Sequence, residues 1–271
     1  MGILNVTPDS FYDGGHHNTT DDALFKAEAM LMEGATIIDI GGESSRPAGA
    51  TYGEGALALG ASAEMERVLP VIEALSTRFP EAVLSIDTYK PEVARQAVAR
   101  GVSIINDITG LRLFPEMASV AADAGTPLIL MHALGAPGAM PHEHQYDDVV
   151  AEVASSLRTS IQIAEAAGVS HIITDPGFGF GKSASENLSL MNHTATFVAL
   201  GYPVLVGISR KSTIGRVLQA GGEVPPPAER LYGTLGATAA AVLRGASIVR
   251  VHDVRATVEM LKGLHAVERG L

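Results

Sequence analysis

The sequence contains no cysteine, and this absence removes several classes of chemistry at once. Disulfides, thiolate metal sites and a cysteine nucleophile are excluded, and the composition agrees with a reducing compartment. We therefore expect a cytoplasmic protein whose chemistry depends on other side chains.

Long apolar runs and positive charge are also scarce. No apolar stretch approaches the roughly 20 residues of a membrane span, and no charged segment followed by an apolar core and a cleavage site opens the chain. With 19 basic against 30 acidic residues, the formal net charge is −11, which repels nucleic acid and anionic membrane surfaces. We expect neither as a partner, so an anionic ligand would need a local cluster of cations.

The chain does have a hydrophobic content of 46%, ample for a buried core, and this content is patterned. Short runs rich in β-branched residues alternate with amphipathic segments of helical periodicity. The runs lie at 1–4, 36–40, 83–87, 103–107, 127–132, 171–175, 203–209 and 247–252, and helical patterns include 21–33, 62–78, 91–100, 147–167 and 229–244. Several helical patterns end just before a glycine that can cap them: Gly34, Gly101, Gly168 and Gly245.

Strand, helix, strand repeats predict a parallel sheet in an α/β protein. Eight units of about 34 residues suit a (β/α)₈ TIM barrel, with an open doubly wound sheet as the main alternative. The proline-rich stretch at 223–230 lies inside a unit and is no linker. We predict a single domain over residues 1–271.

The stretch "DPGFGFGKS" at 175–183 is close to a nucleotide-binding phosphate loop but does not match one. That loop needs four residues between its first glycine and the Gly-Lys pair, and only residues 178–180 separate Gly177 from Gly181. What remains is Asp175, which closes an apolar run, followed by a glycine-rich loop that lets backbone approach a ligand closely.

Polar residues occur where the predicted strands end, which is where barrel enzymes place their active sites. The residues are Asn5, Asp39, Asp87, Asn106, Asp107, His132, Asp175, Lys211, Arg250 and His252. Because side chains alternate along a strand, Arg250 and His252 share one face.

Structural explanations are open for some of these residues. Asp87 could be the N-cap of the following helix, and Asp107 is more readily structural than Asn106. His132 is interpreted as a histidine at the barrel rim, and Arg210 and Lys211 could be a solvated loop pair. The histidine pair 142 and 144 has a metal-like spacing but lies in a long polar stretch, so we expect solvent exposure.

Convergence of so many polar ends on one ring favours a site with two halves. Carboxylate and amide groups together suit a flat nitrogen heterocycle. The cations on the last two strands suit phosphate. Asn5 could supply a neutral oxygen to a Mg²⁺ that keeps its waters and phosphate ligands, which makes a diphosphate ester the natural substrate.

Seven motifs in order resemble the dihydropteroate synthase family over nearly the whole chain. They are "MGILNVTPDSF", "IDIGGESSRP", "SIDTYKPEVA", "IINDITG", "DPGFGFGK", "GISRKSTIG" and "VRVHDV". The resemblance implies a transferase of folate biosynthesis on a (β/α)₈ barrel that is usually a homodimer. It would join p-aminobenzoate to 6-hydroxymethyl-7,8-dihydropterin diphosphate, releasing pyrophosphate and 7,8-dihydropteroate. Sulfonamides mimic p-aminobenzoate in this family.

The resemblance also implies a role for each matching residue. Pterin contacts would be Asp87, Asn106, Asp175, Lys211 and Met131, and the Mg²⁺ ligands would be Asn5 and, more weakly, Asp13. Diphosphate contacts would be Ser45, Arg46, Arg250 and His252, while Arg46, Pro47, Phe180 and Ser212 would line the p-aminobenzoate side. Lys211, Arg250 and His252 would be catalytic.

In this family the carbon–oxygen bond breaks early, giving a cation delocalised over the pterin. Since p-aminobenzoate is a weak nucleophile, catalysis should stabilise the leaving group and the cation, and no general base is required.

Two departures fall on the side of the second substrate. Ser45 stands where the family generally has threonine, and the segment 48–62 is longer than expected, either as a flap over p-aminobenzoate or as a surface insertion.

Three other functions stay open. One is a methyltetrahydrofolate-dependent methyltransferase of the same barrel family, which would have no use for the cations. The others are a Schiff-base aldolase using Lys211 and a catalytically silent partner subunit.

Overall fold

The computed structural model describes residues 1–6, 19–43, 59–135, 145–219 and 222–270. The eight β-branched runs all contain strands, as predicted. The strands are β1 (Gly2–Asn5), β2 (Ile37–Gly41), β3 (Val83–Asp87), β4 (Ile104–Asp107), β5 (Leu128–Met131), β6 (Ile172–Asp175), β7 (Leu205–Val206) and β8 (Ile248–Val249).

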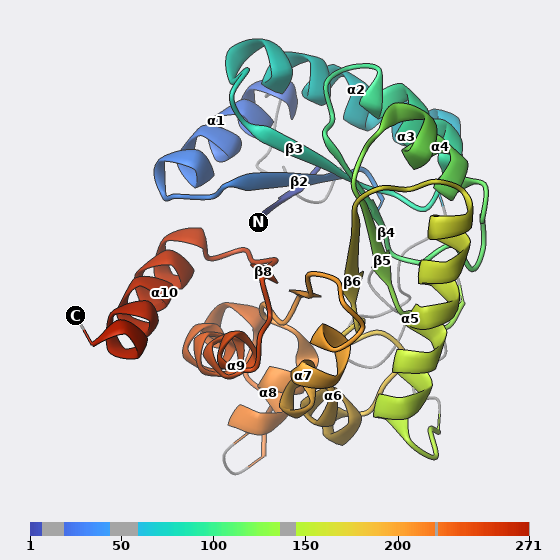
Figure 1. Ribbon diagram of the computed structural model, residues 1–271. Coiled ribbons are helices and arrows are strands. Elements are labelled where there is room, and N and C mark those ends of the chain that lie inside the picture. Colours follow the sequence, from blue (N-terminus) through green and yellow to red (C-terminus); the bar gives the residue numbers. More distant parts are fainter. Residues whose placement is uncertain (7–18, 44–58, 136–144, 220–221, 271) are drawn as a thin grey trace.

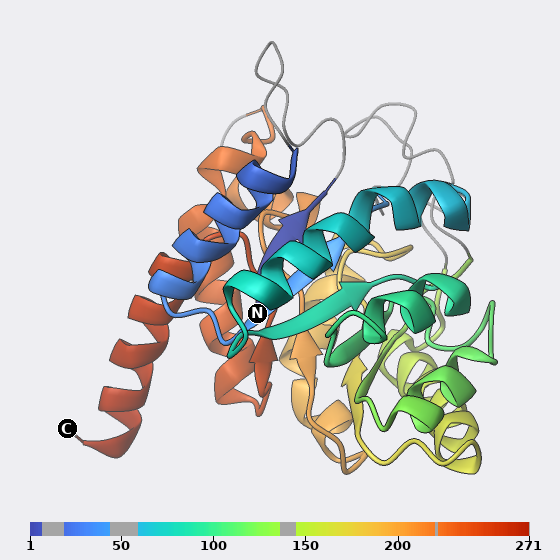
Figure 2. The ribbon, with the colours of Figure 1, turned by 90° about the horizontal axis from the view of Figure 1, so that it is seen from above.

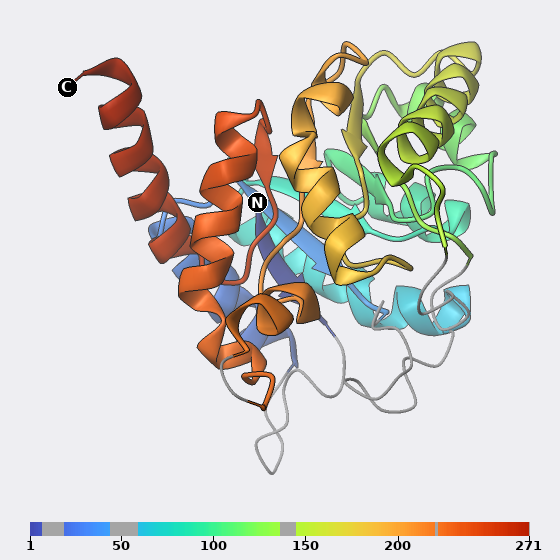
Figure 3. The same ribbon diagram turned by 90° about the horizontal axis from the view of Figure 1, so that it is seen from below.

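The strands run parallel in chain order and close into a ring. β1 to β6 form one sheet and β7 pairs with β8 in a second. Single bridges join the sheets, from Thr174 to Val204 and from Gly2 to Val251. In Figures 1 and 3 the N-terminal strand accordingly lies beside β8. The barrel prediction is confirmed, and the open doubly wound alternative is wrong.

Helices cover the outside of the strands (Figures 1 and 2). They are α1 (Thr19–Met32), α2 (Ala61–Arg78), α3 (Pro91–Val98), α4 (Met117–Ala124), α5 (Val149–Ala166), α6 (Ala184–Asn192), α7 (Thr194–Val198), α8 (Ser212–Leu218), α9 (Leu231–Leu243) and α10 (Val254–Arg269). The four glycines predicted to follow helices all have positive φ, between 89° and 104°. None of the helices in the described ranges is long and apolar enough to cross a membrane.

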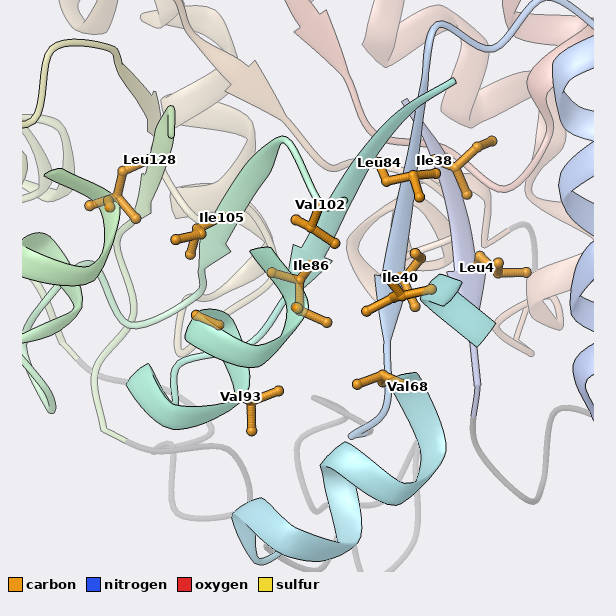
Figure 4. Close-up of a cluster of buried hydrophobic side chains, with 14 of the residues drawn as sticks. Leu4, Ile38, Ile40, Val68, Leu84, Ile86, Val93, Val102, Ile105 and Leu128 are labelled. Atoms are coloured by element: carbon orange, nitrogen blue, oxygen red, sulfur yellow. The ribbon is translucent and has the colours of Figure 1, made fainter. Parts of the chain in front are cut away.

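Alternation along the strands gives each a helix-facing side and a barrel-facing side. On the helix side, Leu4, Ile38, Ile40, Leu84 and Ile86 pack with residues of α2 and α3 in one buried cluster (Figure 4). On the barrel side, a separate apolar cluster fills the interior near the amino ends of the strands: Met1, Ile104, Ile129, Ile173 and Leu205. The polar barrel-facing residues lie at the carboxyl ends of the strands.

The structure corrects one boundary. Ala61 and Ser62, included in the flap predicted at 48–62, form the first turn of α2. Residues 48–58 of that prediction lie outside the described residues. The single-domain assignment stays a prediction.

Candidate active site

Strand register brings three of the predicted site residues to one level. Asn5 pairs with Gly41, Gly41 with Asp87, and Asp87 with Asn106. Gly41 leaves the space between its neighbours open, since a Cβ there would lie 3.7 Å from both Asn5 Oδ1 and Asp87 Oδ2. Asn5, Asp87 and Asn106 therefore share the barrel-facing side of adjacent strand ends.

Arg250 crosses the ring to reach two carboxylates from β2 and β3. Its Nε donates to Asp39 Oδ2 at 2.6 Å, and its Nη2 donates to Asp87 Oδ2 at 2.6 Å. Asn106 Nδ2 donates to the same oxygen of Asp39, at 3.2 Å. Oδ1 of each aspartate is buried without a hydrogen-bond partner among the described residues. The ring thus keeps two acceptors that a ligand's N–H groups could satisfy.

Burial is the main influence on the charge of this group. It raises the pKa of Asp87 to about 7, against the opposing effect of Arg250 and with a further rise from Asp39. Arg250 itself stays protonated, because Asp39 and Asp87 hold its pKa above the ordinary value despite burial. Arg250 therefore places one positive charge between the two carboxyl groups.

The loop after β6 explains why a Gly-Lys-Ser sequence occurs without a phosphate loop. Lys182 is buried and donates to the carbonyls of Gly177 at 2.9 Å and Phe180 at 3.0 Å, so it ties the loop to itself. Gly177 is required there, since a Cβ would lie 1.8 Å from the carbonyl oxygen of His132. Ser183 is the N-cap of α6, in a capping box with Glu186.

Asp175 is oriented by this same loop. Its Oδ1 accepts from the Gly177 N–H at 2.7 Å, and burial raises its pKa although Lys211 and the loop N–H oppose the rise. The backbone N–H of His132 bonds to the carbonyl of Asp175 at 2.9 Å, and the His132 ring lies buried at an angle to Tyr146. The carboxyl group of Asp175 is thereby fixed at the strand end.

Lys211 lies over the loop. Its ammonium group donates to the carbonyl of Phe178 and lies 4.2 Å from the centre of the Phe180 ring. Burial lowers its pKa to about 7, partly offset by Asp175. Ser212 follows directly as the first residue of α8. Lys211 thus joins Phe180 and Asp175 in one group.

The cations after β7 and β8 have separate supports. Arg210 pairs with Asp253, with its Nε 2.9 Å from Oδ2, so it is not the solvated loop cation that its sequence position allowed. His252 Nδ1 lies 2.9 Å from Ser209 Oγ. Desolvation by surrounding protein, with Arg250 and Arg210 adding to it, lowers the pKa of His252 to about 4, although the residue keeps an exposed edge.

An apolar wall borders the polar ring. Tyr89, Ile108, Met131, Ala133 and Phe180 form one buried cluster, drawn from four different strand ends and loops. Met131 pairs in register with Asp175. A flat ligand held by the aspartates would therefore meet sulfur and aromatic surface alongside.

Comparison with known proteins agrees with this geometry. A family model described as "Pterin binding enzyme" matches residues 1–252. The dihydropteroate synthase of Escherichia coli K12 is 47% identical over 268 residues, covering 98% of this chain and 90% of the relative. The chain belongs to the family of pterin-binding enzymes that includes the dihydropteroate synthases.

Solved structures of the family are also similar to this chain. Xanthomonas albilineans dihydropteroate synthase with 4-aminobenzoic acid has a TM-score of 0.88 and 44% identity, covering 98% of this chain and 92% of that one. The same enzyme in complex with 7,8-dihydropteroate has a TM-score of 0.84 and 42% identity over the same shares. These similarities favour a synthase over the methyltransferase alternative.

The structure gathers most of the predicted site residues. Those brought to the carboxyl ends of the strands, or to the loops and helix starts that follow, are Asn5, Asp87, Asn106, Met131, Asp175, Phe180, Lys211, Ser212, Arg250 and His252. Predicted residues outside the described ranges are Asp13, Ser45, Arg46, Pro47 and the histidines 142 and 144.

Several structural explanations can now be decided. Asp87 is not a helix cap, because α3 begins at Pro91 with Lys90 as its N-cap. Asp107 is structural, since its carboxylate accepts from the N–H groups of Thr109 at 2.8 Å and Leu111 at 2.7 Å. The separation into a polar half and a cationic half is also less clean than expected, because Arg250 is paired with carboxylates of the polar half.

Two groups were missed by sequence reasoning. Asp39 was noted at a strand end but given no role, although its position two residues before Gly41 places it on the same face. The other group is a buried set of acidic residues around Lys90, including Glu64 inside α2. Nothing in an amphipathic helix marks one glutamate as buried, so this group had no local signal.

Proposed function

We propose that this protein is a Mg²⁺-dependent dihydropteroate synthase. It joins the amine of p-aminobenzoate to the methylene carbon of 6-hydroxymethyl-7,8-dihydropterin diphosphate. The carbon–oxygen bond breaks first and pyrophosphate leaves with the bridging oxygen; the carbon–nitrogen bond then forms, and the amine releases one proton. The observation that carries the proposal is the ring of Asp39, Asp87, Asn106 and Asp175 with Arg250 and Lys211 beside it, in a chain of this family.

The ring suits the pterin because its donors and acceptors match a flat, nitrogen-rich heterocycle. Asp175 has one carboxylate oxygen engaged by the loop N–H, which leaves the other for a ligand. Asp87 and Asn106 lie in register on adjacent strands and would face the pterin from the side opposite Asp175. Met131 supplies an apolar contact surface.

The cations suit the reacting bond. Arg250 and Lys211 would stabilise negative charge as pyrophosphate departs, and His252 would donate a hydrogen bond to it. The nearby carboxylates Asp39, Asp87 and Asp175 would stabilise positive charge on the pterin. Since p-aminobenzoate then meets an electrophilic carbon, its weak nucleophilicity is sufficient and no general base is assigned. Phe180 and Ser212 would contact p-aminobenzoate, with Arg46 and Pro47 from the sequence prediction.

A magnesium ion fits the ligand set that this chain offers. The described residues contain no group of three or more histidine or acidic side chains that could hold a metal alone. Asn5 is exposed at the strand ends beside Asp87, and Mg²⁺ usually keeps waters and substrate phosphates with only one or two protein ligands. Asn5 would hold it, with Asp13 as a second candidate. When bound it supplies positive charge to the departing pyrophosphate.

The proposal extends to a homodimer in the cytoplasm. Exposed apolar side chains on α8 and α9 support self-association: Val217, Tyr232 and Leu243. The lack of cysteine supports a reducing compartment. Sedimentation equilibrium should give twice the chain mass, and a monomer at micromolar concentration would contradict the dimer.

The reaction itself can be tested with purified protein. The pterin diphosphate, p-aminobenzoate and Mg²⁺ should give dihydropteroate, and removing Mg²⁺ with a chelator should abolish the rate until the metal is restored. A sulfonamide should compete with p-aminobenzoate. Absence of dihydropteroate in the complete mixture would refute the proposed function, and an unchanged rate after chelation would refute its metal dependence.

A further inference from the structure

The turn that follows β7 contains an unfavourable backbone conformation. The N–H of Lys211 donates to the carbonyl of Ile208 at 3.2 Å, which closes a β-turn over residues 208–211, here called the Lys211 turn. Arg210, the third residue of this turn, has a φ of 58°. Turns with a positive φ at that position ordinarily have glycine there, because a Cβ makes the left-handed conformation unfavourable. Contacts from elsewhere in the chain must therefore stabilise Arg210 in this conformation.

The start of α9 holds the backbone on both sides of Arg210. Thr234 lies in the first turn of α9, and its Oγ1 accepts from the Arg210 N–H at 3.1 Å. Arg230 is the N-cap of the same helix, and its Nη1 donates to the Arg210 carbonyl at 2.8 Å. The Arg210 side chain is held separately, by Asp253. Two residues of one helix terminus thus fix the peptide groups that flank the unfavourable φ.

Arg230 is deeply buried for an arginine, with 2% of its surface exposed. Its Nε donates to the carbonyl of Pro225 at 2.9 Å, so the guanidinium joins this carbonyl to that of Arg210. Gly215 of α8 makes room for it, because a Cβ there would lie 2.7 Å from Arg230 Nε. α8 and α9 accordingly pack against each other (Figure 1). Since a cation is costly to bury, its use as a link between carbonyls favours a geometric role.

The Lys211 turn supports two side chains of the candidate active site. Lys211 is the N-cap of α8, and its side chain passes over the loop after β6. This path is tight, because a Cβ on Gly179 would lie 2.6 Å from Lys211 Cδ. Ser209 Oγ accepts from the backbone N–H of His252 at 3.2 Å and lies 2.9 Å from its Nδ1. A shift of the turn would therefore move Lys211 relative to the loop and loosen the support of His252.

We propose that Arg230 and Thr234 are positioning residues: they hold the backbone of Arg210 and so direct Lys211 toward the pterin and the departing pyrophosphate. The inference rests on the proposed function, which assigns Lys211 to both. Arg230 and Thr234 act through the Lys211 turn rather than on the substrates.

Thr234→Val tests one of the two contacts, with Thr234→Ser as its matched control. Valine has nearly the shape of threonine but cannot accept the Arg210 N–H, whereas serine keeps the hydroxyl group. Thr234→Val should lower kcat/KM for the pterin diphosphate by about threefold to tenfold, the equivalent of one neutral hydrogen bond. Thr234→Ser should retain the wild-type value.

Arg230→Met tests the other contact, with Arg244→Met as its matched control. Arg244 is the C-cap of the same helix and also donates to backbone carbonyls, those of Asn192 at 3.1 Å and Ala240 at 2.8 Å. Arg230→Met should lower kcat/KM for the pterin diphosphate by about tenfold or more, since small misplacements of reacting groups have effects of this size. Arg244→Met should retain the wild-type value.

A second readout does not depend on activity. Burial is the main reason why the pKa of Lys211 lies at about 7. Asp175 and Asp87 oppose this fall, and Arg250 adds to it. If the turn loosens and the ammonium group gains solvent, its pKa should rise toward the ordinary lysine value. NMR titration of ¹³C-labelled lysine measures this pKa, with the Lys211 signal identified by its loss in Lys211→Arg.

The rise is expected in Thr234→Val and Arg230→Met, while Thr234→Ser and Arg244→Met should titrate like the wild type. A thermal melt shows which variants fold, and if Arg230→Met does not, the two Thr234 variants carry both measurements.

The outcomes are separable. A wild-type protein that makes no dihydropteroate would refute the proposed function, and an unchanged Lys211 titration in the folded test variants would by itself overturn the positioning role. In an active enzyme, a wild-type kcat/KM in Thr234→Val would overturn it as well. So would equal losses in Thr234→Val and Thr234→Ser, or in Arg230→Met and Arg244→Met.

Discussion

Replacing Arg250 by methionine tests the most unusual feature of the site, one cation between two buried carboxylates. Asp39 is fully buried and the Asp87 side chain is 12% exposed, each 2.6 Å from the guanidinium. Methionine keeps much of the side-chain volume but leaves both carboxylates without the cation. Breaking a buried pair by removing one partner costs about 3–5 kcal/mol, so we expect Arg250→Met to lower the free energy of unfolding by about that much.

The loss of stability in Arg250→Met should increase with pH. Arg250 lowers the pKa of Asp87, which burial raises to about 7, so the variant should have a still higher pKa there. A carboxyl group with a raised folded-state pKa stabilises below its ordinary pKa, and that stability is lost as pH rises through the folded value. Above pH 7 the variant holds a proton that the wild type has released, so its cost grows by about 1.4 kcal/mol per pH unit.

Urea denaturation at about pH 6 and about pH 8.5 measures the difference, which should be about 1–2 kcal/mol larger at the higher pH. Arg100→Met removes a largely exposed ion pair with Glu73. It should lower the free energy of unfolding by at most about 1 kcal/mol at both pH values. Adding Asp87→Asn to Arg250→Met should recover part of the loss at pH 8.5. An Arg250→Met cost below about 1 kcal/mol, or one independent of pH, would refute the reasoning.

Three further predictions concern other parts of the site. Asp175→Ala and Asn106→Ala should each weaken binding of a pterin lacking its diphosphate by about tenfold or more, while His252→Ala should not; calorimetric titration would show equal losses in all three if the assignment is wrong. Lys182→Met should destabilise more at pH 9 than at pH 7, because burial lowers the Lys182 pKa to about 7 and a depressed pKa gives stability that is lost as pH falls. The increment is about 1.4 kcal/mol per pH unit in urea denaturation, and a pH-independent cost would contradict it. Shortening the segment 48–58 should raise KM for p-aminobenzoate and alter sulfonamide inhibition, with pterin diphosphate affinity nearly unchanged; if both p-aminobenzoate properties stay as in the wild type, the segment is a surface insertion.

The barrel was predictable because its strands are apolar on both faces in the half nearer their amino ends. Ile104 faces the barrel and Ile105 faces the helices, so the run at 103–107 contains two successive β-branched residues. The strand-end residues followed from the fold, since barrel chemistry gathers at the carboxyl ends. Pro91 could also have shown that Asp87 is no cap, because proline favours the first helical position.

The ion pairs could not be predicted, because their partners are distant in sequence. Arg250 and Asp39 are separated by 211 positions, and only the closure of the ring brings them together. Glu64 is 0% exposed although it occupies a helix whose pattern predicts mixed exposure, since α2 packs over the loops that follow β2 and β3. Tertiary packing, not local sequence, determines which charged residues are buried and which partners they have.

The most direct test of the central claim follows one oxygen atom through the reaction. The substrate is the pterin diphosphate labelled with ¹⁸O in the bridge between its methylene carbon and the diphosphate, incubated with p-aminobenzoate, Mg²⁺ and the purified protein. If the site ionises the carbon–oxygen bond and captures the pterin with the amine, all of the label appears in pyrophosphate, and dihydropteroate forms in equal amount. Label retained in a hydroxymethylpterin, or pyrophosphate formed without dihydropteroate, would contradict the account.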